Sequence, residues 1–354
     1  MNAADFTSFP TPYPSSQERR ENRFSTTRRQ CFRRAGLVVA LAASATLPFA
    51  ASAQTDNWPT RPLRLIAGYP AGTSPDLQAR LIAEQLSKAL GQPVVVENKP
   101  GASGNIGAEM IAKADDGHTI GIIGNGPLTS SRFLYSKLAY DPAKDFAPIV
   151  MVGTAPLVWV APKAAVTGTV ADYVKSVQAA GDKVNYGSIG AGSGSHLAME
   201  LIKERLGLKA VHIPFAGGPQ ILNGILGGEI QMTLLPGSTV APMVQSGKMA
   251  AIAVTSAERS PLEPNLPSMN EIGAKGVNIE VWNAIMAPAK MPAAHQAKLN
   301  AEIGKILQSK EVGEKLAQLG WKVEDTSTKT LVDRIKSDTA TYGALITAKG
   351  YKLD

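Results

Sequence analysis

The feature of this sequence that most constrains its fold is a regular alternation of strand-like and helix-like segments, which begins just after Trp58. Short apolar runs such as "LRLIAGY" and "VVVEN" predict strands. Between them, "SPDLQARLIAEQLSKALG" repeats leucine and isoleucine on one helical face and ends at Gly91, a common helix stop. Because successive parallel strands need a crossover connection, repeated units of this kind predict parallel sheets covered by helices on both faces. The expected fold class is therefore α/β.

The alternation can be followed through almost the whole chain. It predicts strands at residues 63–69, 94–98, 118–124, 156–162, 183–189, 210–215, 230–236, 249–256 and 279–289. It predicts helices at residues 74–91, 105–114, 170–181, 195–207, 219–228, 293–308, 311–320 and 330–350. Residues 140–149 and the proline-rich residues 259–273 are predicted to be loops.

The first 53 residues have the composition of an export signal. Seven arginines precede residue 35, an uncharged stretch follows, and Ala51-Ser52-Ala53 is typical of a cleavage site, so we expect cleavage near Ala53. The uncharged stretch is rich in alanine and serine and contains Pro48, which makes a membrane anchor the weaker interpretation. The pair Arg28-Arg29 leaves both twin-arginine and general export open.

The processed chain would carry little net charge and no cysteine. The formal charge of the whole chain is +7, and the signal, with seven arginines and three acidic residues, supplies +4 of it, so +3 remains. This charge is scattered, without the lysine and arginine clusters that mark nucleic-acid binding, so no nucleic-acid partner is expected. The only cysteine, Cys31, lies within the signal. Disulfides and cysteine-based metal sites are therefore excluded after processing, and no cofactor is expected.

Three loops share one design, in which a strand ends, small residues follow and a helix begins. They are residues 68–76 ("GYPAGTSPD"), residues 100–109 ("PGASGNIGAE") and residues 185–201 ("NYGSIGAGSGSHLAMEL"). In a parallel sheet such loops emerge at the carboxyl edge of the strands, where ligands bind. Glycines let main-chain N–H groups approach an anion closely, and the start of the following helix adds unpaired donors. The three loops are therefore a candidate anion-binding site.

The chemistry of these loops favours a carboxylate. None of them contains lysine or arginine, so an anion would be held by neutral donors, among them the hydroxyls of Thr73, Ser74, Ser193 and Ser195. Each hydrogen bond to a charged group contributes roughly 1.5–3 kcal/mol, so three or four could offset the desolvation of one carboxylate. A phosphate more usually recruits a cation as well. The alternative for each loop is that glycine and serine only cap helices and turn the chain.

Several polar and aromatic residues near these loops also have structural interpretations. Asp76 either meets a ligand amine or hydroxyl or, more commonly at such a position, caps the helix that follows. Trp159 and Trp282 are either hinge or pocket aromatics or, as is more common for tryptophan, pack in the core. His196 follows Ser195 directly, but adjacent residues on a helix point about 100° apart, so the pair is not expected to form an activated serine nucleophile.

Motifs typical of nucleotide-binding proteins and of hydrolases are missing. The glycine-rich loops lack the G-x-G-x-x-G spacing, no G-K-[ST] ends a phosphate loop, and no G-x-S-x-G nucleophile elbow occurs. The four histidines form no H-x-H or H-E-x-x-H pair. A periplasmic hydrolase or transferase that uses Ser193 or Ser195 stays the main alternative from a different class.

The order of the motifs resembles the solute-binding proteins of tripartite tricarboxylate transporters, the Bug receptor family. The resemblance begins with residues 61–120, from "RPLRLIAGYPAGTSPD" to "DDGHTI". It continues through "YDPAKDFAPI", "NYGSIGAGSGSHLAMELI", "HIPFAGG", "ILGGEIQM", "SGKMAAIAVTSAERSP" and "LPSMNEIG" into the C-terminal helices. Each phrase alone is moderately specific, whereas their order is highly specific and covers nearly all of the processed chain.

This resemblance implies a type II periplasmic binding protein fold, with two α/β lobes joined by crossover strands and a ligand cleft between them. Residues 58–155 and 283–354 would form lobe one, and residues 156–282 would form lobe two. The ligand carboxylate would lie among main-chain amides and small hydroxyl residues, and no catalytic residue or metal ligand is expected. The expected ligand-binding residues are Tyr69, Thr73, Ser74, Asp76, Ala102, Ser103, Gly104, Ser188, Gly192, Ser193, Ser195, Phe215, Ala216 and Gly217.

The sequence departs from the usual pattern of the family at three of these positions or beside them. Thr73 stands where a second glycine is usual, and Pro75, in "SPD", removes one amide donor. Phe215 replaces a more frequent tyrosine and so removes a hydroxyl near the cleft. These differences prevent the transfer of any one member's ligand to this chain.

The function that the resemblance implies is solute capture. We expect a periplasmic, monomeric receptor without enzyme activity, whose lobes close on a small carboxylate such as a di- or tricarboxylate or an aromatic carboxylate. It would deliver this ligand to membrane transporter subunits. A ligand-sensing partner of a sensor kinase would use the same fold and stays open as an alternative role.

Overall fold

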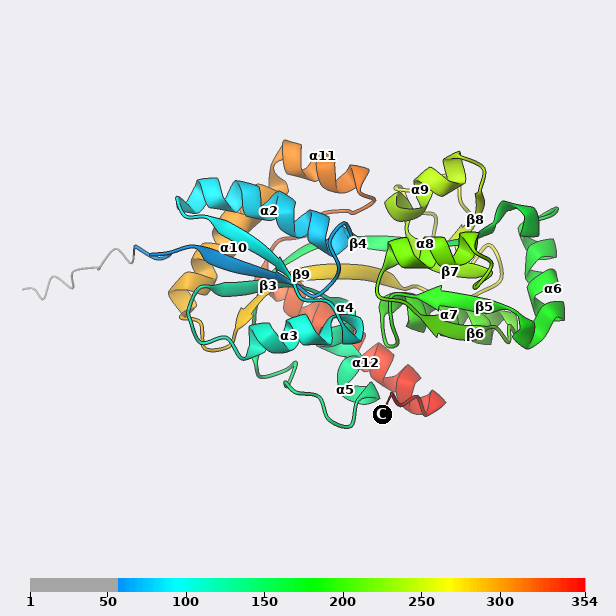
Figure 1. The fold of residues 1–354 in the computed structure, drawn as a ribbon, viewed down its shortest axis with the longest axis horizontal. Coiled ribbons are helices and arrows are strands. Elements are labelled where there is room, and N and C mark those ends of the chain that lie inside the picture. Colours follow the sequence, from blue (N-terminus) through cyan, green and yellow to red (C-terminus); the bar gives the residue numbers. More distant parts are fainter. Residues whose placement is uncertain (1–56, 354) are drawn as a thin grey trace, which may run out of the picture. The chain divides into compact units, whose positions relative to one another are not determined.

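The computed structural model describes residues 57–353, so the predicted export signal, residues 1–53, lies outside the described residues. From Asn57 onward the chain forms one compact unit of mixed strands and helices (Figure 1). Within residues 57–353, no helix combines the length and the hydrophobicity that crossing a bilayer requires.

The strands and helices follow one another in the predicted order. The strands are β1 (Leu63–Ala67), β2 (Val94–Asn98), β3 (Thr119–Gly124), β4 (Phe146–Pro162), β5 (Asn185–Ser188), β6 (Val211–Pro214), β7 (Met232–Pro236), β8 (Met249–Val254) and β9 (Glu280–Pro288). The helices are α2 (Ser74–Leu90), α3 (Asn105–Ala112), α4 (Asn125–Thr129), α5 (Ser131–Leu134), α6 (Val170–Ala180), α7 (Gly194–Leu206), α8 (Gly218–Leu226), α9 (Gly237–Gln245), α10 (Ala293–Gln308), α11 (Lys310–Gln318) and α12 (Thr328–Lys349). The sequence analysis did not predict α4, α5 and α9.

Lobe one is built on β2, β1, β3, β9 and the first half of β4, which lie side by side in that order. The pairs β1–β2 and β1–β3 are parallel, as the alternation predicts. Helices cover both faces of this sheet, with α2 and α10 on one face and α3 and α12 on the other (Figure 1). The apolar stripe of α2 enters the core through Ile82 and Leu86, which are fully buried.

Lobe two is built on β6, β5 and β7, which pair in parallel, together with the second half of β4 and β8. One face of this sheet buries Val174 of α6 and Leu197 of α7. The other face buries Ile221 of α8 and Val240 of α9. The loops that follow β5 and β6 therefore open on the same edge of lobe two.

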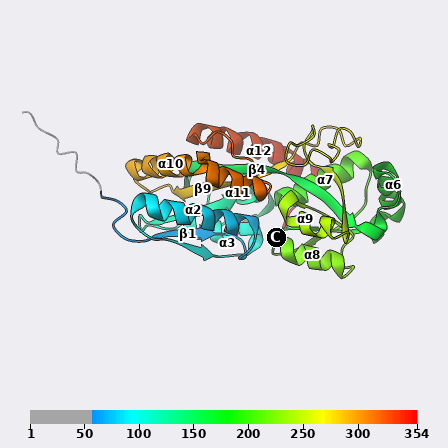
Figure 2. The same ribbon diagram turned by 90° about the horizontal axis from the view of Figure 1, so that it is seen from above.

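Two long strands connect the lobes. β4 pairs antiparallel with β9 from Phe146 to Pro156, and beyond that point it pairs antiparallel with β7 and β8 (Figure 2). The sheets are therefore mixed, whereas the alternation of strands and helices predicted parallel sheets. The division of the lobes at residues 155/156 and 282/283 stays a prediction.

The prediction of a loop at residues 140–149 is wrong from Phe146 on, because β4 begins at that residue. Proline cannot donate to a strand ladder, so Pro148 is an unusual residue inside a strand. In the structure the β4–β9 register shifts between Pro148 and Val150. The carbonyl of Ile149 instead accepts hydrogen bonds from Asn300 Nδ2 at 2.8 Å and Thr328 Oγ1 at 2.9 Å. The bulge thus accommodates the proline and ties the strand to the C-terminal helices.

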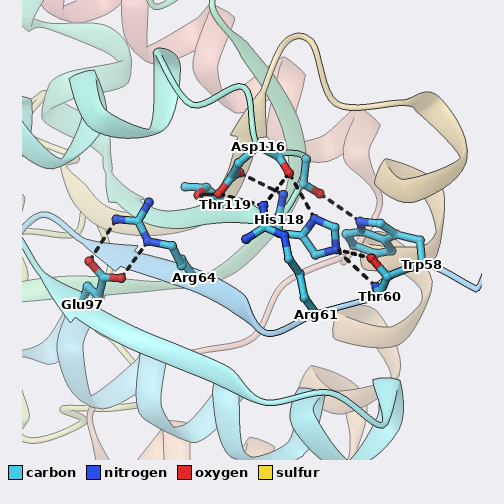
Figure 3. A network of polar contacts seen from close by, with 9 residues as sticks. Trp58, Thr60, Arg61, Arg64, Glu97, Asp116, His118 and Thr119 are labelled. Carbon is cyan, nitrogen blue, oxygen red and sulfur yellow. Dashed lines mark hydrogen bonds and ion pairs between the residues drawn. The ribbon is translucent and has the colours of Figure 1, made fainter.

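A polar network holds the start of the described chain against lobe one (Figure 3). Trp58 Nε1 donates to the carbonyl of Gly117 at 2.9 Å, and Thr60 N donates to His118 Nε2 at 3.3 Å. Arg64 on β1 forms a bidentate pair with Glu97 on β2, with N–O distances of 2.7 and 3.0 Å. These contacts fasten residues 58–64 to β2 and to the turn before β3.

Candidate ligand-binding site

A cavity of about 300 Å³ lies between the two lobes. Leu157 of β4 and Val281 and Trp282 of β9 line it from the connecting strands. The β1–α2 loop lines it from lobe one, and the first residues of α7, α8 and α9 line it from lobe two. Most of its lining is apolar, and none of the described residues that line it carries a charge. A ligand there would meet apolar side chains and neutral donors.

The β1–α2 loop is held in shape by its own polar groups. Thr73 is the N-cap of α2, and its hydroxyl donates to the carbonyl of Pro70 at 2.7 Å. Pro75 lies in the first turn of α2, where its missing N–H leaves no helical bond unmade. Thr73 and Ser74 both line the cavity. The loop therefore presents small polar residues on a fixed backbone.

Asp76 supports this loop from behind. Asp76 is 1 % exposed, and its carboxylate accepts hydrogen bonds from Gly72 N at 2.9 Å and Asn98 Nδ2 at 2.8 Å. Arg80, one turn later on α2, pairs with it at 2.9 Å. Burial opposes ionisation, but the bonds from Arg80, Gly72 and Asn98 outweigh it and hold the pKa of Asp76 below its usual value. Its polar atoms are engaged by the protein, and it does not line the cavity.

The β5–α7 loop is the glycine–serine segment of the sequence. Ser193 is the N-cap of α7, and its hydroxyl donates to the carbonyl of Gly190 at 2.6 Å. Ser195 Oγ accepts from Ile189 N at 3.3 Å and lines the cavity. Gly190 and Gly192 have φ angles of +110° and +78°, which only glycine adopts without strain. The glycines thus allow the turn that places Ser195 at the cavity.

The β2–α3 loop crosses to lobe two. Ala102 and Ser103 have φ angles of +46° and +56°, a left-handed conformation that non-glycine residues rarely adopt. Ser103 Oγ donates to the carbonyl of Ala191 at 2.9 Å, and Ser103 O accepts from Tyr69 OH at 3.2 Å. A Cβ at Gly190 would lie only 2.1 Å from Ser103 Oγ. The strained turn is therefore the point at which the β2–α3 loop meets the β5–α7 loop.

A second contact joins the lobes at α9. The hydroxyl of Ser238, in the first turn of α9, donates a short hydrogen bond to the carbonyl of Leu319, which follows α11. Gly320 has a φ of +76°, and a Cβ there would lie 3.2 Å from Ser238 N. Leu319, Trp321 and Ser238 all line the cavity. The lobes therefore contact each other both at Ser103 and at Ser238.

The structure distributes the sequence-predicted ligand residues over three places. The cavity is lined by Tyr69, Thr73, Ser74, Ser195 and Gly217. A neighbouring hollow of about 310 Å³, which shares Tyr69 and Ile189 with the cavity, is lined by Ala102, Ser103, Gly104, Phe215 and Ala216. Four residues line neither space: Asp76, Ser188, Gly192 and Ser193.

Other cavity-lining residues were not among those predicted. Asn125 begins α4, Ser238 and Thr239 lie in the first turn of α9, and Trp321 follows α11. The segments "GNGPLT" after β3 and "PGSTV" after β7 repeat the pattern of a strand, small residues and a helix start. The same pattern that identified the three loops could therefore have found α4 and α9.

The starts of four helices bring partial positive charge to the cavity. Ser74, Ser195, Gly218 and Ser238 lie in the first turns of α2, α7, α8 and α9, and all four line the cavity. The first N–H groups of each helix lack a partner within the helix, and the aligned peptide dipoles place partial positive charge there. Among the described residues, Trp321 Nε1 has no hydrogen-bond partner either. The site can therefore attract an anion without a cationic side chain.

Comparison with known proteins identifies the family. The model of the tripartite tricarboxylate transporter family receptors matches residues 78–351. This chain belongs to that receptor family. Its members are receptors of three-part transporters for small carboxylates, which agrees with the resemblance found in the sequence.

Solved structures of similar proteins support the receptor family assignment. Rpa4515 of R. palustris with adipate is 30 % identical, with a TM-score of 0.80 over 84 % of this chain and 100 % of that one. MatC (Rpa3494) from Rhodopseudomonas palustris with bound malate is 28 % identical, with a TM-score of 0.76 over 82 % of this chain and 100 % of that one. The periplasmic binding protein BugD is 31 % identical, with a TM-score of 0.77 over 84 % of this chain and 100 % of that one. The expected two-lobed periplasmic binding fold is confirmed.

The contacts of the serines in the described part of the chain do not support the alternative of a serine hydrolase. Neither Ser193 nor Ser195 contacts a histidine ring through a hydrogen bond in this part of the chain. Ser188 Oγ does lie 2.7 Å from His212 Nε2, but Ser188 is fully buried, out of reach of a substrate. Among residues 57–353, no group of three histidine or acidic side chains is placed to hold a metal ion.

Proposed function

We propose that this protein is a periplasmic receptor that captures a small carboxylate between its lobes and delivers it to a membrane transporter. The observation that carries the proposal is the uncharged cavity at the starts of α2, α7, α8 and α9. Hydrogen bonds to an ionised carboxylate contribute roughly 1.5–3 kcal/mol each, so a few neutral donors suffice for micromolar affinity, about −8 kcal/mol. The composition of residues 1–53 supports export to the periplasm.

The ligand's carboxylate would lie against Ser74 and Ser195, whose hydroxyls lie in helix first turns on opposite lobes. Thr73, Tyr69 and Gly217 would complete this polar end. The entrance to the cavity would be the neighbouring hollow, lined by Ala102 to Gly104, Phe215 and Ala216. The shapes of the β1–α2 and β5–α7 loops would depend on Asp76, Ser188, Gly192 and Ser193. The last four therefore act on the ligand through the backbone that they hold.

Beyond this carboxylate, the ligand would be mainly hydrocarbon, as in the four CH₂ groups that join the two carboxylates of adipate. Leu222, Leu234 and Leu235 line the cavity from lobe two, and Val281 and Trp282 line it from the connecting strands. Burying a CH₂ group against such a surface contributes about 0.8 kcal/mol, whereas burying an unpaired hydroxyl costs free energy. The proposal therefore favours a carboxylate with an apolar chain or ring, such as adipate, over a short hydroxylated one such as malate.

Lobe closure would couple capture to delivery. A ligand that contacts both lobes stabilises the closed form by its differential contacts, in addition to the bonds at Ser103 and Ser238. A monomer with lobes divided at residues 155/156 and 282/283 suffices for this mechanism. No chemical step is part of it, so we propose that the protein is not an enzyme.

Calorimetric titration of the processed chain tests the proposal. We expect adipate, hexanoate and benzoate to bind with micromolar affinity and malate to bind at least tenfold more weakly. The variant S195A should weaken binding of the preferred acid about tenfold, because one hydrogen bond to a charged group is lost. Its control is S176A, because the hydroxyl of Ser176 donates to the carbonyl of Tyr173 on α6, a helix that contributes no residue to the cavity lining. If no mono-, di-, tri- or aromatic carboxylate binds, the proposal is wrong.

A further inference from the structure

Four aromatic rings lie in a row behind the β5–α7 loop. Tyr186 of β5 and His212 of β6 have ring centroids 5.0 Å apart, and His212 and His196 of α7 are stacked at 4.2 Å. The row ends at Tyr351, just past the C-terminal helix α12, with its centroid 5.9 Å from that of His196. The end of α12 reaches lobe two in both ribbon views (Figures 1 and 2). The row thus joins two strands, one helix and the C-terminal segment.

One carboxylate clamps the two ends of this row. Glu200, on α7, is 8 % exposed and accepts a hydrogen bond from Tyr186 OH at 2.6 Å. It also accepts one from Tyr351 OH and one from Lys203 Nζ, the latter at 2.6 Å. Lys203 supplies the positive charge that a buried carboxylate requires. Glu200 therefore fixes both terminal rings and, through them, the two histidines in between.

The two histidines contact the β5–α7 loop and the strand end before it. His196 Nδ1 accepts a hydrogen bond from Gly192 N at 3.1 Å, so this nitrogen carries no proton. His212 Nε2 lies 2.7 Å from Ser188 Oγ, and the single hydrogen of that hydroxyl points to Gly190 O at 3.0 Å. Both contacts are satisfied when His212 donates from Nε2. Each histidine thus holds one side of the turn that precedes Ser195.

The C-terminal segment is fastened to the same region by further contacts. Lys349 pairs with Glu204 of α7 at 2.6 Å. Leu353 N donates to the carbonyl of Leu134 at 2.9 Å, and Leu353 lines the hollow beside Ala191. Residues 349–353 therefore bridge α7 of lobe two and α5, at the edge of the ligand site.

The geometry points to a positioning function for this cluster: His196 and His212, clamped by Glu200 between Tyr186 and Tyr351, hold the β5–α7 loop in its ligand-binding shape. Tyr351, in the C-terminal segment, is then part of the binding machinery, although it does not line the cavity. The inference rests on the proposed function, because that function gives the β5–α7 loop its role of presenting Ser195 to the ligand carboxylate.

The test replaces His196 in two ways. In H196N the side-chain oxygen can occupy the place of Nδ1 and accept from Gly192 N, whereas H196F keeps a ring without an acceptor. We expect hydrogen exchange of the Gly192 amide, measured by NMR without ligand, to stay slow in H196N and to accelerate at least tenfold in H196F. Adipate affinity should fall about tenfold in H196F and stay within about twofold in H196N, because a buried N–H is left unpaired only in the former.

A second variant, outside the buried core, tests the same cluster without the risk that a core substitution prevents folding. Y351F deletes only the hydroxyl that reaches Glu200, at a half-buried residue, and its matched control is Y173F in the core of lobe two, against Trp159. We expect Y351F to accelerate exchange at Gly192 and to weaken adipate binding several-fold, with Y173F unchanged in both. Unaltered Gly192 exchange in both H196F and Y351F overturns the inference. If Gly192 exchange changes in the variants as expected but the wild type binds no carboxylate, the positioning cluster is supported and only the proposed function is contradicted.

Discussion

The hydroxyl of Ser103 on lobe one donates a 2.9 Å hydrogen bond to the main-chain carbonyl of Ala191 on lobe two. Ser103 makes this contact from a left-handed backbone conformation, with a φ of +56°. Residues in such conformations cost roughly 1–3 kcal/mol and persist where surrounding contacts enforce them. The turn is therefore strained in the same place where it joins the lobes, which is consistent with a contact that forms on closure.

Removal of the Ser103 hydroxyl should shift the lobes towards an open form. S103A deletes the donor and keeps the strained backbone, so the closed form loses a bond worth about 1 kcal/mol. We expect small-angle scattering of the ligand-free variant to give a larger radius of gyration than the wild type, and adipate to bind about fivefold more weakly. The control S176A should match the wild type in both measurements. An unchanged radius and affinity in S103A would show that the contact plays no part in closure.

A carboxylate placed on the cavity wall should weaken ligand binding strongly. Leu222 lines the cavity from α8, and at about 5 Å an added negative charge repels a bound carboxylate by about 3 kcal/mol at an effective dielectric of 20. L222D should therefore weaken adipate binding about 100-fold. Leu226, one turn later, is 49 % exposed and does not line the cavity, so L226D is the matched control and should bind adipate normally. Equal affinities in L222D and L226D would place the ligand elsewhere.

Stability should fall in mild acid because of His196. Burial lowers the pKa of His196 to about 4, from an ordinary value of about 6.5. Between these pH values the unfolded chain binds a proton that the native protein excludes, so the free energy of unfolding falls as the pH drops, by up to roughly 3 kcal/mol. Denaturant titrations of wild type and H196N from pH 7.5 to 4 measure the effect. H196N should have the flatter profile, and parallel profiles would contradict the assignment.

Two buried tryptophans should differ in their contribution to stability. Trp282 Nε1 donates to Asp338 Oδ2 at 2.6 Å, whereas no partner for Trp159 Nε1 exists among the described residues. W282F leaves a buried carboxylate with one donor fewer, so it should destabilise the protein by about 1–3 kcal/mol beyond the loss in W159F. Chemical denaturation of the two variants gives the comparison. An equal loss in both would mean that the bond to Asp338 contributes nothing.

The sequence was most informative about loops that follow parallel strands. The alternation of strands and helices placed the β1–α2, β2–α3 and β5–α7 loops at the carboxyl edges of parallel strands. The family resemblance divided these loops between two lobes, and Ser103 does reach Ala191. It could not show the direction of the Asp76 side chain. That direction depends on Asn98, which β2 brings beside the loop from 22 residues away. Contacts between distant segments of this kind leave no local pattern.

One missed helix, α9, follows a recognisable strand end but contains residues that ordinarily indicate a loop. α9 contains Pro242 and begins at Gly237, and glycine and proline ordinarily indicate a loop. Packing of Val240 against lobe two overrides that preference, since Val240 is only 2 % exposed. Trp321 likewise reaches the cavity because Lys322 pairs with Thr154 on β4, a pairing that only the tertiary structure reveals.

A crystal structure of the protein with bound adipate tests the central claim most directly. Our account predicts carboxylate oxygens within hydrogen-bonding distance of Ser74 or Ser195 and of first-turn amides of α2, α7 or α8, with methylene groups against Leu222 and Leu234. A lysine, arginine or histidine in contact with the carboxylate, or adipate bound outside this cavity, would contradict it.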